Sequence, residues 1–166
     1  NVKKSLLKQA LRLFSATVKY FPLEKVFDDN LLSRFLDDLN KISASRIDLM
    51  KCFGEIFSIT LEIHTHGEDA YYRYKNLMVQ LFQSYMKQMG LITNNLDFHQ
   101  EYNKINSTQK YNFEEFSLQF AISITSFFKS NFAFIQDFDF IVGVTTEVSE
   151  FTKLYMNEIG QGLLYL

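Results

Sequence analysis

The sequence predicts an all-α fold, an α-α superhelix of antiparallel helical pairs of the HEAT type. Helical stretches follow one another without the alternating pattern of strands, and apolar residues recur three or four positions apart on one face of each. The stretches also pair at intervals close to those of stacked helical repeats, which are roughly 40 to 47 residues long. A chain of 166 residues holds about three such pairs. Such arrays act through their surfaces, so a scaffold is expected rather than an enzyme.

The expected pairs cover about residues 5–41, 44–90 and 110–166, with a polar connector at 91–110. The sequence begins at Asn1 without an initiating Met and ends on an apolar stretch at residues 162–166. We therefore expect a segment of a much longer chain, whose outer helices neighbouring repeats would cover.

The first pair opens with an amphipathic helix that Pro22 should end, because proline lacks an amide proton and disfavours helical geometry in the residue before it. A short turn or helix at 23–28 leads to a second helix over about 30–41. The inward side chains of the first helix are Leu7, Ala10, Leu11, Phe14 and Val18, and those of the second are Leu31, Leu32, Phe35, Leu36 and Leu39.

The second pair opens with a helix that Ser43 or Ser45 should cap, with Asp48 in a capping-box position. Its predicted core stripe is Leu49, Met50, Phe53, Ile56 and Phe57, and its predicted polar stripe is Asp48, Lys51, Glu55, Ser58 and Glu62. A loop at 64–69 should lead to the fourth helix, over about 71–89, with Gly90 as its C-terminal cap. The inward residues predicted for that helix are Tyr74, Leu77, Met78, Leu81, Tyr85 and Met89.

The Asn-rich connector is expected to hold one helical turn near residues 96–102. The fifth helix, at about 111–130, is apolar on most sides and should pack between layers. Its polar strip is predicted to be Glu115, Gln119, Ser123, Ser126 and Ser130, between a stripe through Phe116 and Phe127 and another through Leu118 and Ile122. A last helix or pair should begin near Asp139.

Composition excludes several classes of protein. A net charge of −2 and a pI near 5.9 give no electrostatic reason to expect nucleic acid or an anionic membrane. The single cysteine, Cys52, cannot form an internal disulfide, which favours the cytosol or nucleus. Apolar runs stay well short of the roughly 20 residues that span a bilayer. Proteins are therefore the expected partners.

The sequence holds few candidates for chemistry. His64 and His66, near Glu68 and Asp69, would bind a metal only with a further ligand, and two solvated histidines are the simpler interpretation. Cys52 lies in a helix beside Phe53, where an inert thiol is expected. Adjacent acidic pairs on helices point in different directions. We therefore predict no catalytic residues, no cofactor and no metal.

The third helix contains the segment Leu49-Met50-Lys51-Cys52-Phe53-Gly54-Glu55-Ile56, which resembles nuclear export receptors of the exportin-1 type, in the importin-β (karyopherin) superfamily. The resemblance extends over about residues 5–135 and places this chain in the N-terminal half of such a receptor. Other segments that agree in order are Ser5-Leu6-Leu7 with Ala10-Leu11-Arg12, Phe21-Pro22 followed by Val26-Phe27 and Leu31-Leu32, and Tyr111-Asn112-Phe113-Glu114-Glu115-Phe116-Ser117-Leu118 followed by Phe127-Phe128-Lys129.

The resemblance implies a HEAT-repeat receptor that binds the GTPase Ran in its GTP state together with cargo carrying a leucine-rich export signal. It also implies contacts with nucleoporins and shuttling between nucleus and cytoplasm. In such receptors the second helix of each pair lines the concave surface, here residues 30–41 and 71–89. The implied contact residues for Ran or another domain are Arg34, Asp37, Asp38, Lys41, Arg73, Gln80 and Lys87, for which ordinary solvation is the alternative.

Two other classes of protein remain open on the sequence. A HEAT or armadillo adaptor unrelated to Ran would share the architecture. A self-contained helical bundle that binds an apolar ligand would need a closed cavity among Phe116, Phe120 and Tyr85.

Overall fold

The structure, a computed structural model, is helical throughout its regular elements, which confirms the predicted all-α class for the residues it describes. Those residues are 2–41, 43–94, 107–135, 139, 141–146 and 149, and no strand occurs among them. In the same part of the chain, no helix is both long enough and apolar enough to cross a membrane.

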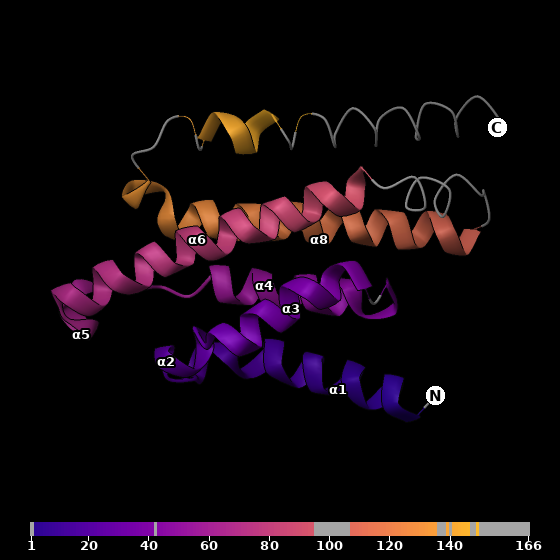
Figure 1. The fold of residues 1–166 in the computed structure, drawn as a ribbon, viewed down its shortest axis with the longest axis horizontal. Helices are drawn as coiled ribbons and strands as arrows, with labels where there is room; N and C mark the ends of the chain where they lie inside the picture. The colour runs from indigo at the N-terminus through magenta and orange to yellow at the C-terminus, as the bar shows by residue number, and fades with distance from the viewer. Residues whose placement is uncertain are drawn as a thin grey trace.

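The helices follow one another with short connections in the N-terminal part of the chain (Figure 1). In order they are α1 (Val2–Thr17), the 3₁₀ turn η1 (Val18–Tyr20), α2 (Leu23–Val26), α3 (Asp29–Lys41), η2 (Ser43–Ser45), α4 (Arg46–Phe57), α5 (Ile63–His66), α6 (Glu68–Thr93), α8 (Ser107–Asn131) and η3 (Phe132–Phe134). Residues 141–146 are helical as well, so the predicted last helix is present where it is described.

The long helices form two layers. In one layer α4 lies between α1 and α8 and packs against both, while α3 and α6 pack side by side in the other. Figure 1 shows α3 crossing α4, and α6 crossing α8, on the near side of the molecule. Helices therefore alternate between the layers along the chain, as expected for stacked helical pairs.

The junction between α1 and α3 agrees with the prediction for Pro22. Helix α1 ends at Thr17, whose hydroxyl donates to the Leu13 carbonyl at 2.7 Å, and the chain tightens into η1. Phe21 is extended (ψ 148°), as the residue before a proline prefers. The turn at α2 follows, and the Asp28 carboxylate then caps α3 by accepting from the Leu31 N–H at 2.9 Å.

The predicted capping box at the start of α4 is wrong. Ser45 occupies the cap position, but its side chain makes no capping hydrogen bond. Asp48, predicted on the polar stripe, is 6% exposed and lies 3.5 Å from the Arg12 guanidinium of α1. The reason is packing on both sides: with α1 and α8 against it, α4 has little solvent-facing surface left, and Asp48 instead forms an ion pair between helices.

Helix α6 is longer at both ends than predicted. The expected loop at 64–69 contains α5, and α6 begins directly after Gly67, whose φ of 82° is a conformation that favours glycine. At the other end α6 passes through Gly90 and stops at Thr93, with Asn94 as its cap, so Gly90 is an interior residue. The helix α8 likewise begins at Ser107. The turn expected at 96–102 lies outside the described residues.

The prediction for α8 has its two sides reversed. Ser123 is fully buried and Gln119 is 9% exposed, whereas Leu118 and Ile122 are 54% and 42% exposed. The cause is close approach between α8 and α4. A Cβ on Gly54 would lie only 3.8 Å from Ser123 Cα, so the small residues of α8, and not its leucine, meet α4.

The core of the described residues is an aromatic cluster shared by α4, α6 and α8. The rings of Phe82 and Phe127 stack with centroids 3.8 Å apart, and the ring of Phe57 packs edge-on against both, at 5.2 and 5.8 Å. Phe53 extends the cluster to Phe35 of α3 at 6.3 Å. Each such aromatic pair adds about 0.5–1.5 kcal/mol beyond the burial of its area, so this cluster joins the two layers.

Candidate functional site: the α3–α6 surface

Helix α6 presents a polar stripe to solvent. Arg73, Gln80 and Lys87 recur every seven residues, and Asn76 and Gln83 fall between them on the same face. All five are exposed, while Met78, Tyr85 and Met89 on the other side are fully buried. The division between faces predicted for this helix is therefore confirmed for these residues.

Helix α3 presents a second stripe. Arg34, Asp37 and Lys41 are exposed, and Asp38 is half-buried beside them. Lys41 Nζ lies 3.1 Å from Asp37 Oδ2, one turn away, with both side chains about two-thirds exposed. An ion pair so open to water is worth little and is screened by salt, so both charges remain available to a partner.

A hydrogen bond between the two helices makes one surface of the two stripes. Asn40 of α3 donates through Nδ2 to Gln88 Oε1 of α6. The two helices are neighbours in the same layer (Figure 1), so their outward faces look to the same side. We call Arg34, Asp37, Asp38, Lys41, Arg73, Gln80 and Lys87 together the α3–α6 surface. The structure brings these residues onto adjacent helices but into no enclosed site.

Arg73 is held at one end of this surface. Its guanidinium lies 5.7 Å from the centroid of the Tyr74 ring, and that ring in turn packs on Phe27 at 5.4 Å. A cation over an aromatic face is stabilised by the ring quadrupole. The contact restrains the arginine without neutralising it, so its charge stays accessible.

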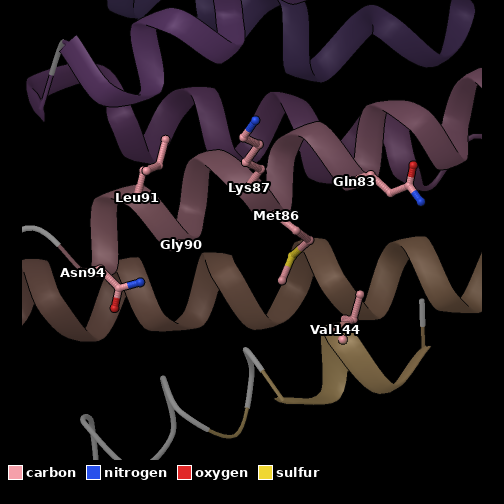
Figure 2. A pocket seen from close by; sticks show the side chains of 8 residues that line it. Gln83, Met86, Lys87, Gly90, Leu91, Asn94 and Val144 are labelled. Atoms are coloured by element: carbon pink, nitrogen blue, oxygen red, sulfur yellow. The ribbon is translucent and has the colours of Figure 1, made fainter. Parts of the chain in front are cut away.

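A shallow groove of about 350 Å³ lies at the other end, between α6 and residues 143–144 (Figure 2). Its lining residues are Gln83, Met86, Lys87, Gly90, Leu91, Asn94, Gly143 and Val144. Figure 2 shows the Met86 side chain directed toward α8 and Val144, and Lys87 and Leu91 directed the opposite way. Lys87 therefore borders both the groove and the α3–α6 surface.

Cys52 has no chemical role in this arrangement. It is fully buried, and its thiol donates to the Leu11 carbonyl at 3.3 Å, joining α4 to α1. Burial, and secondarily the negative charge of Asp48, raises the pKa of the Cys52 thiol to about 12. A nucleophile needs a thiolate, so this cysteine is unreactive in the folded protein.

The two histidines predicted to be solvated have only local partners. His66 Nδ1 lies 3.0 Å from the Glu62 carbonyl oxygen, one turn earlier, and His64 is exposed. Among the described residues, no three His, Cys, Asp or Glu side chains gather in a way that would hold a metal.

Sequence reasoning missed the buried cation at the start of α6. Lys75 is 3% exposed, and its Nζ donates to the Ser130 carbonyl at 2.7 Å and to Asn131 Oδ1 at 3.0 Å. Burial lowers the pKa of this lysine. The ammonium satisfies acceptors at the end of α8, where cations are favoured. Its position between Tyr71 and Met78 on the inward face was the available signal.

Comparisons with protein-family models, with curated proteins and with solved structures give no match for this chain. The functional case therefore depends on the layered fold, the α3–α6 surface and the sequence resemblance.

Proposed function

We propose that this chain is a segment of a nuclear export receptor of the exportin-1 type, which binds Ran-GTP and cargo carrying a leucine-rich export signal. In this proposal the segment is a HEAT-type scaffold, and it contributes the α3–α6 surface to contacts with Ran or with another domain of the receptor. The receptor shuttles between nucleus and cytoplasm and touches nucleoporins on the way.

The observation that carries the proposal is the alternation of helices between two layers. The first helices of successive pairs, α1, α4 and α8, stack in one layer, and the second helices, α3 and α6, stack in the other. The resemblance assigns partner contacts to the second helices, and these are the helices that present the exposed charges of Arg34, Asp37 and Arg73. The layering and the resemblance thus favour the same surface.

The proposed mechanism is linked binding. Ran-GTP and cargo each favour one curvature of the array, so that each raises the affinity for the other by the same factor. A stacked array can change its curvature through small adjustments between neighbours, because each pair contacts only the next. The Lys51–Glu115 ion pair between α4 and α8, at 3.1 Å, is one contact that would adjust in this way.

The apolar-ligand alternative has little support in the packing. The Tyr85 ring lies 5.0 Å from that of Phe53 and 5.4 Å from that of Phe57, and its hydroxyl is hydrogen-bonded to Ser123. The ring thus fills the region in which such a ligand would sit. An adaptor unrelated to Ran keeps the same architecture and is an outcome of the experiment below.

The proposal is tested by capture of purified Ran, loaded with GTP or with GDP, on the full-length protein that contains this chain and on the chain alone. Selective capture of Ran-GTP by the full-length protein, strengthened by an export-signal peptide, supports the receptor. Capture by the chain alone places part of the interface on this segment. If neither nucleotide form of Ran is captured with the peptide present, the chain is a helical adaptor with another partner.

A further inference from the structure

Helix α1 carries a second apolar face in addition to the one that packs on the core. Leu11 and Val18 are 3% and 0% exposed and face α4. On another side of α1, Val2, Leu6 and Leu13 are 84%, 65% and 66% exposed. Exposed leucines that are scattered singly need no explanation, but these three residues share one face.

The spacing of this face is that of a helix-pairing seam. Val2, Leu6 and Leu13 are separated by four and seven residues, as in the alternate core positions of a heptad repeat. Gln9 and Ala16 occupy the remaining core positions of that repeat. The seam runs the length of α1, whose 16 residues extend for about 24 Å. A second helix can therefore lie along it.

One side of the seam is lined by cations. Lys4, Lys8 and Arg12 follow one another at every fourth residue, and Lys19 continues the row seven residues later. No acidic residue precedes Glu24 in the sequence. Arg12 is paired with Asp48, but in the described part of the chain neither Lys4 nor Lys8 has a carboxylate within ion-pairing distance.

We propose that this outward face of α1 docks an amphipathic helix of a partner protein, with an apolar stripe against Val2, Leu6 and Leu13 and acidic residues facing Lys4 and Lys8. Complementary charges beside an apolar seam select both the partner and its orientation. This site lies on α1, apart from the α3–α6 surface, and does not depend on the proposed export function.

An anionic membrane fits the same face less well. A helix that lies in a membrane interface presents a broad apolar face bounded by charges. The seam of α1 is narrow and contains Gln9, and α1 is fixed in the array by its packing on α4. A single interacting helix matches this width better.

The test uses two synthetic helical peptides of about four heptads, long enough to form helix. Both have leucine at the seam positions, and the flanking positions are glutamate in one and lysine in the other. Fluorescence anisotropy of each labelled peptide is followed as the chain is added. We expect the glutamate peptide to bind about tenfold tighter or better at low salt, with the preference falling as salt is raised.

Three sets of variants locate the binding. The double substitution Leu6→Glu and Leu13→Glu should abolish binding of the glutamate peptide, and Lys4→Glu with Lys8→Glu should reverse the preference toward the lysine peptide. Leu118→Glu, at a similarly exposed leucine of α8, is the matched control and should bind as the parent does. Because all of these side chains are exposed, helical circular dichroism and melting should be unchanged.

Equal binding of both peptides, or no binding of either, overturns the proposal. So does loss of binding in the Leu118→Glu control. Association of the chain with vesicles of phosphatidylcholine and phosphatidylserine, in the absence of any glutamate-peptide binding, assigns the face to a membrane and likewise contradicts it.

Discussion

The hydroxyl groups of Tyr85 and Ser123 are hydrogen-bonded at 2.9 Å, and both residues are completely buried. The bond joins α6 of one layer to α8 of the other, at the point where α8 passes Gly54 of α4. Ser123 also donates to or is held at the Phe120 carbonyl, at 2.8 Å. Three helices thus meet at one small polar contact inside an aromatic core.

Replacing Tyr85 by phenylalanine tests this contact. The ring packing is kept and one buried hydrogen bond is lost, so we expect the free energy of unfolding to fall by about 1 kcal/mol. Urea denaturation followed by circular dichroism measures it. Tyr20→Phe, at a tyrosine that is 76% exposed, should leave the midpoint unchanged. An equal loss in both variants would mean that the buried bond contributes nothing.

Gly54 gives a prediction with opposite signs for two substitutions. A Cβ there would meet Ser123 and Ile122 atoms at 3.8–4.0 Å, which is ordinary contact. Gly54→Ala should therefore stabilise the protein by up to about 1 kcal/mol through helix propensity. Gly54→Leu should destabilise it by about 1–3 kcal/mol through overpacking.

Gly90 is the matched control for Gly54. A Cβ at Gly90 would have no atom within 4 Å, so Gly90→Ala should stabilise by a similar amount and Gly90→Leu should be tolerated. Thermal melting of the four variants provides the comparison. Equal tolerance of leucine at both glycines would contradict the close approach of α4 and α8.

Lys75 should be costly to replace although it is a lysine. Lys75→Met keeps the aliphatic stem but leaves Asn131 Oδ1 and the Ser130 carbonyl without their donor, a loss of about 1–3 kcal/mol. Lys25→Met, on an exposed side of α2, should change little. Denaturation midpoints of the two variants decide the matter, and similar midpoints would rule out the buried role.

Cys52 should make stability depend on pH above neutrality. Its pKa rises from 9.0 to about 12 on folding, so the folded state holds the proton more tightly. The resulting stability is complete below pH 9 and is lost as the pH rises from 9 toward 12. Unfolding free energies measured between pH 8 and 10 should fall less steeply in Cys52→Ala than in the parent chain. Parallel slopes would contradict this.

The sequence predicted most of what local patterns control. The end of α1 before Pro22, the short α2 and the inward and outward faces of α6 follow from side-chain periodicity and from the missing amide of proline. The α3–α6 surface was found on the same basis, because its residues lie on the polar side of amphipathic helices.

The errors lie where two backbones approach each other. In α8 the apolar residues surround the helix, and only the fit of Ser123 against Gly54 decides which side is inward. Asp48 and Lys75 are buried because neighbouring helices supply Arg12 and the end of α8 as partners. Such pairings join residues far apart in the sequence, so periodicity alone cannot reveal them.

The most direct test of the central claim is the affinity of Ran-GTP for the full-length protein carrying Asp37→Lys and Asp38→Lys, measured by titration. The control reverses two charges in the other layer, Glu55→Lys and Glu114→Lys, which are exposed on α4 and α8. If the α3–α6 surface contacts Ran, the first variant should bind about tenfold or more weakly and the control should bind normally. Unchanged Ran-GTP affinity in the first variant would remove Asp37 and Asp38 from the interface, and absence of Ran binding by the unaltered protein would contradict the export-receptor proposal itself.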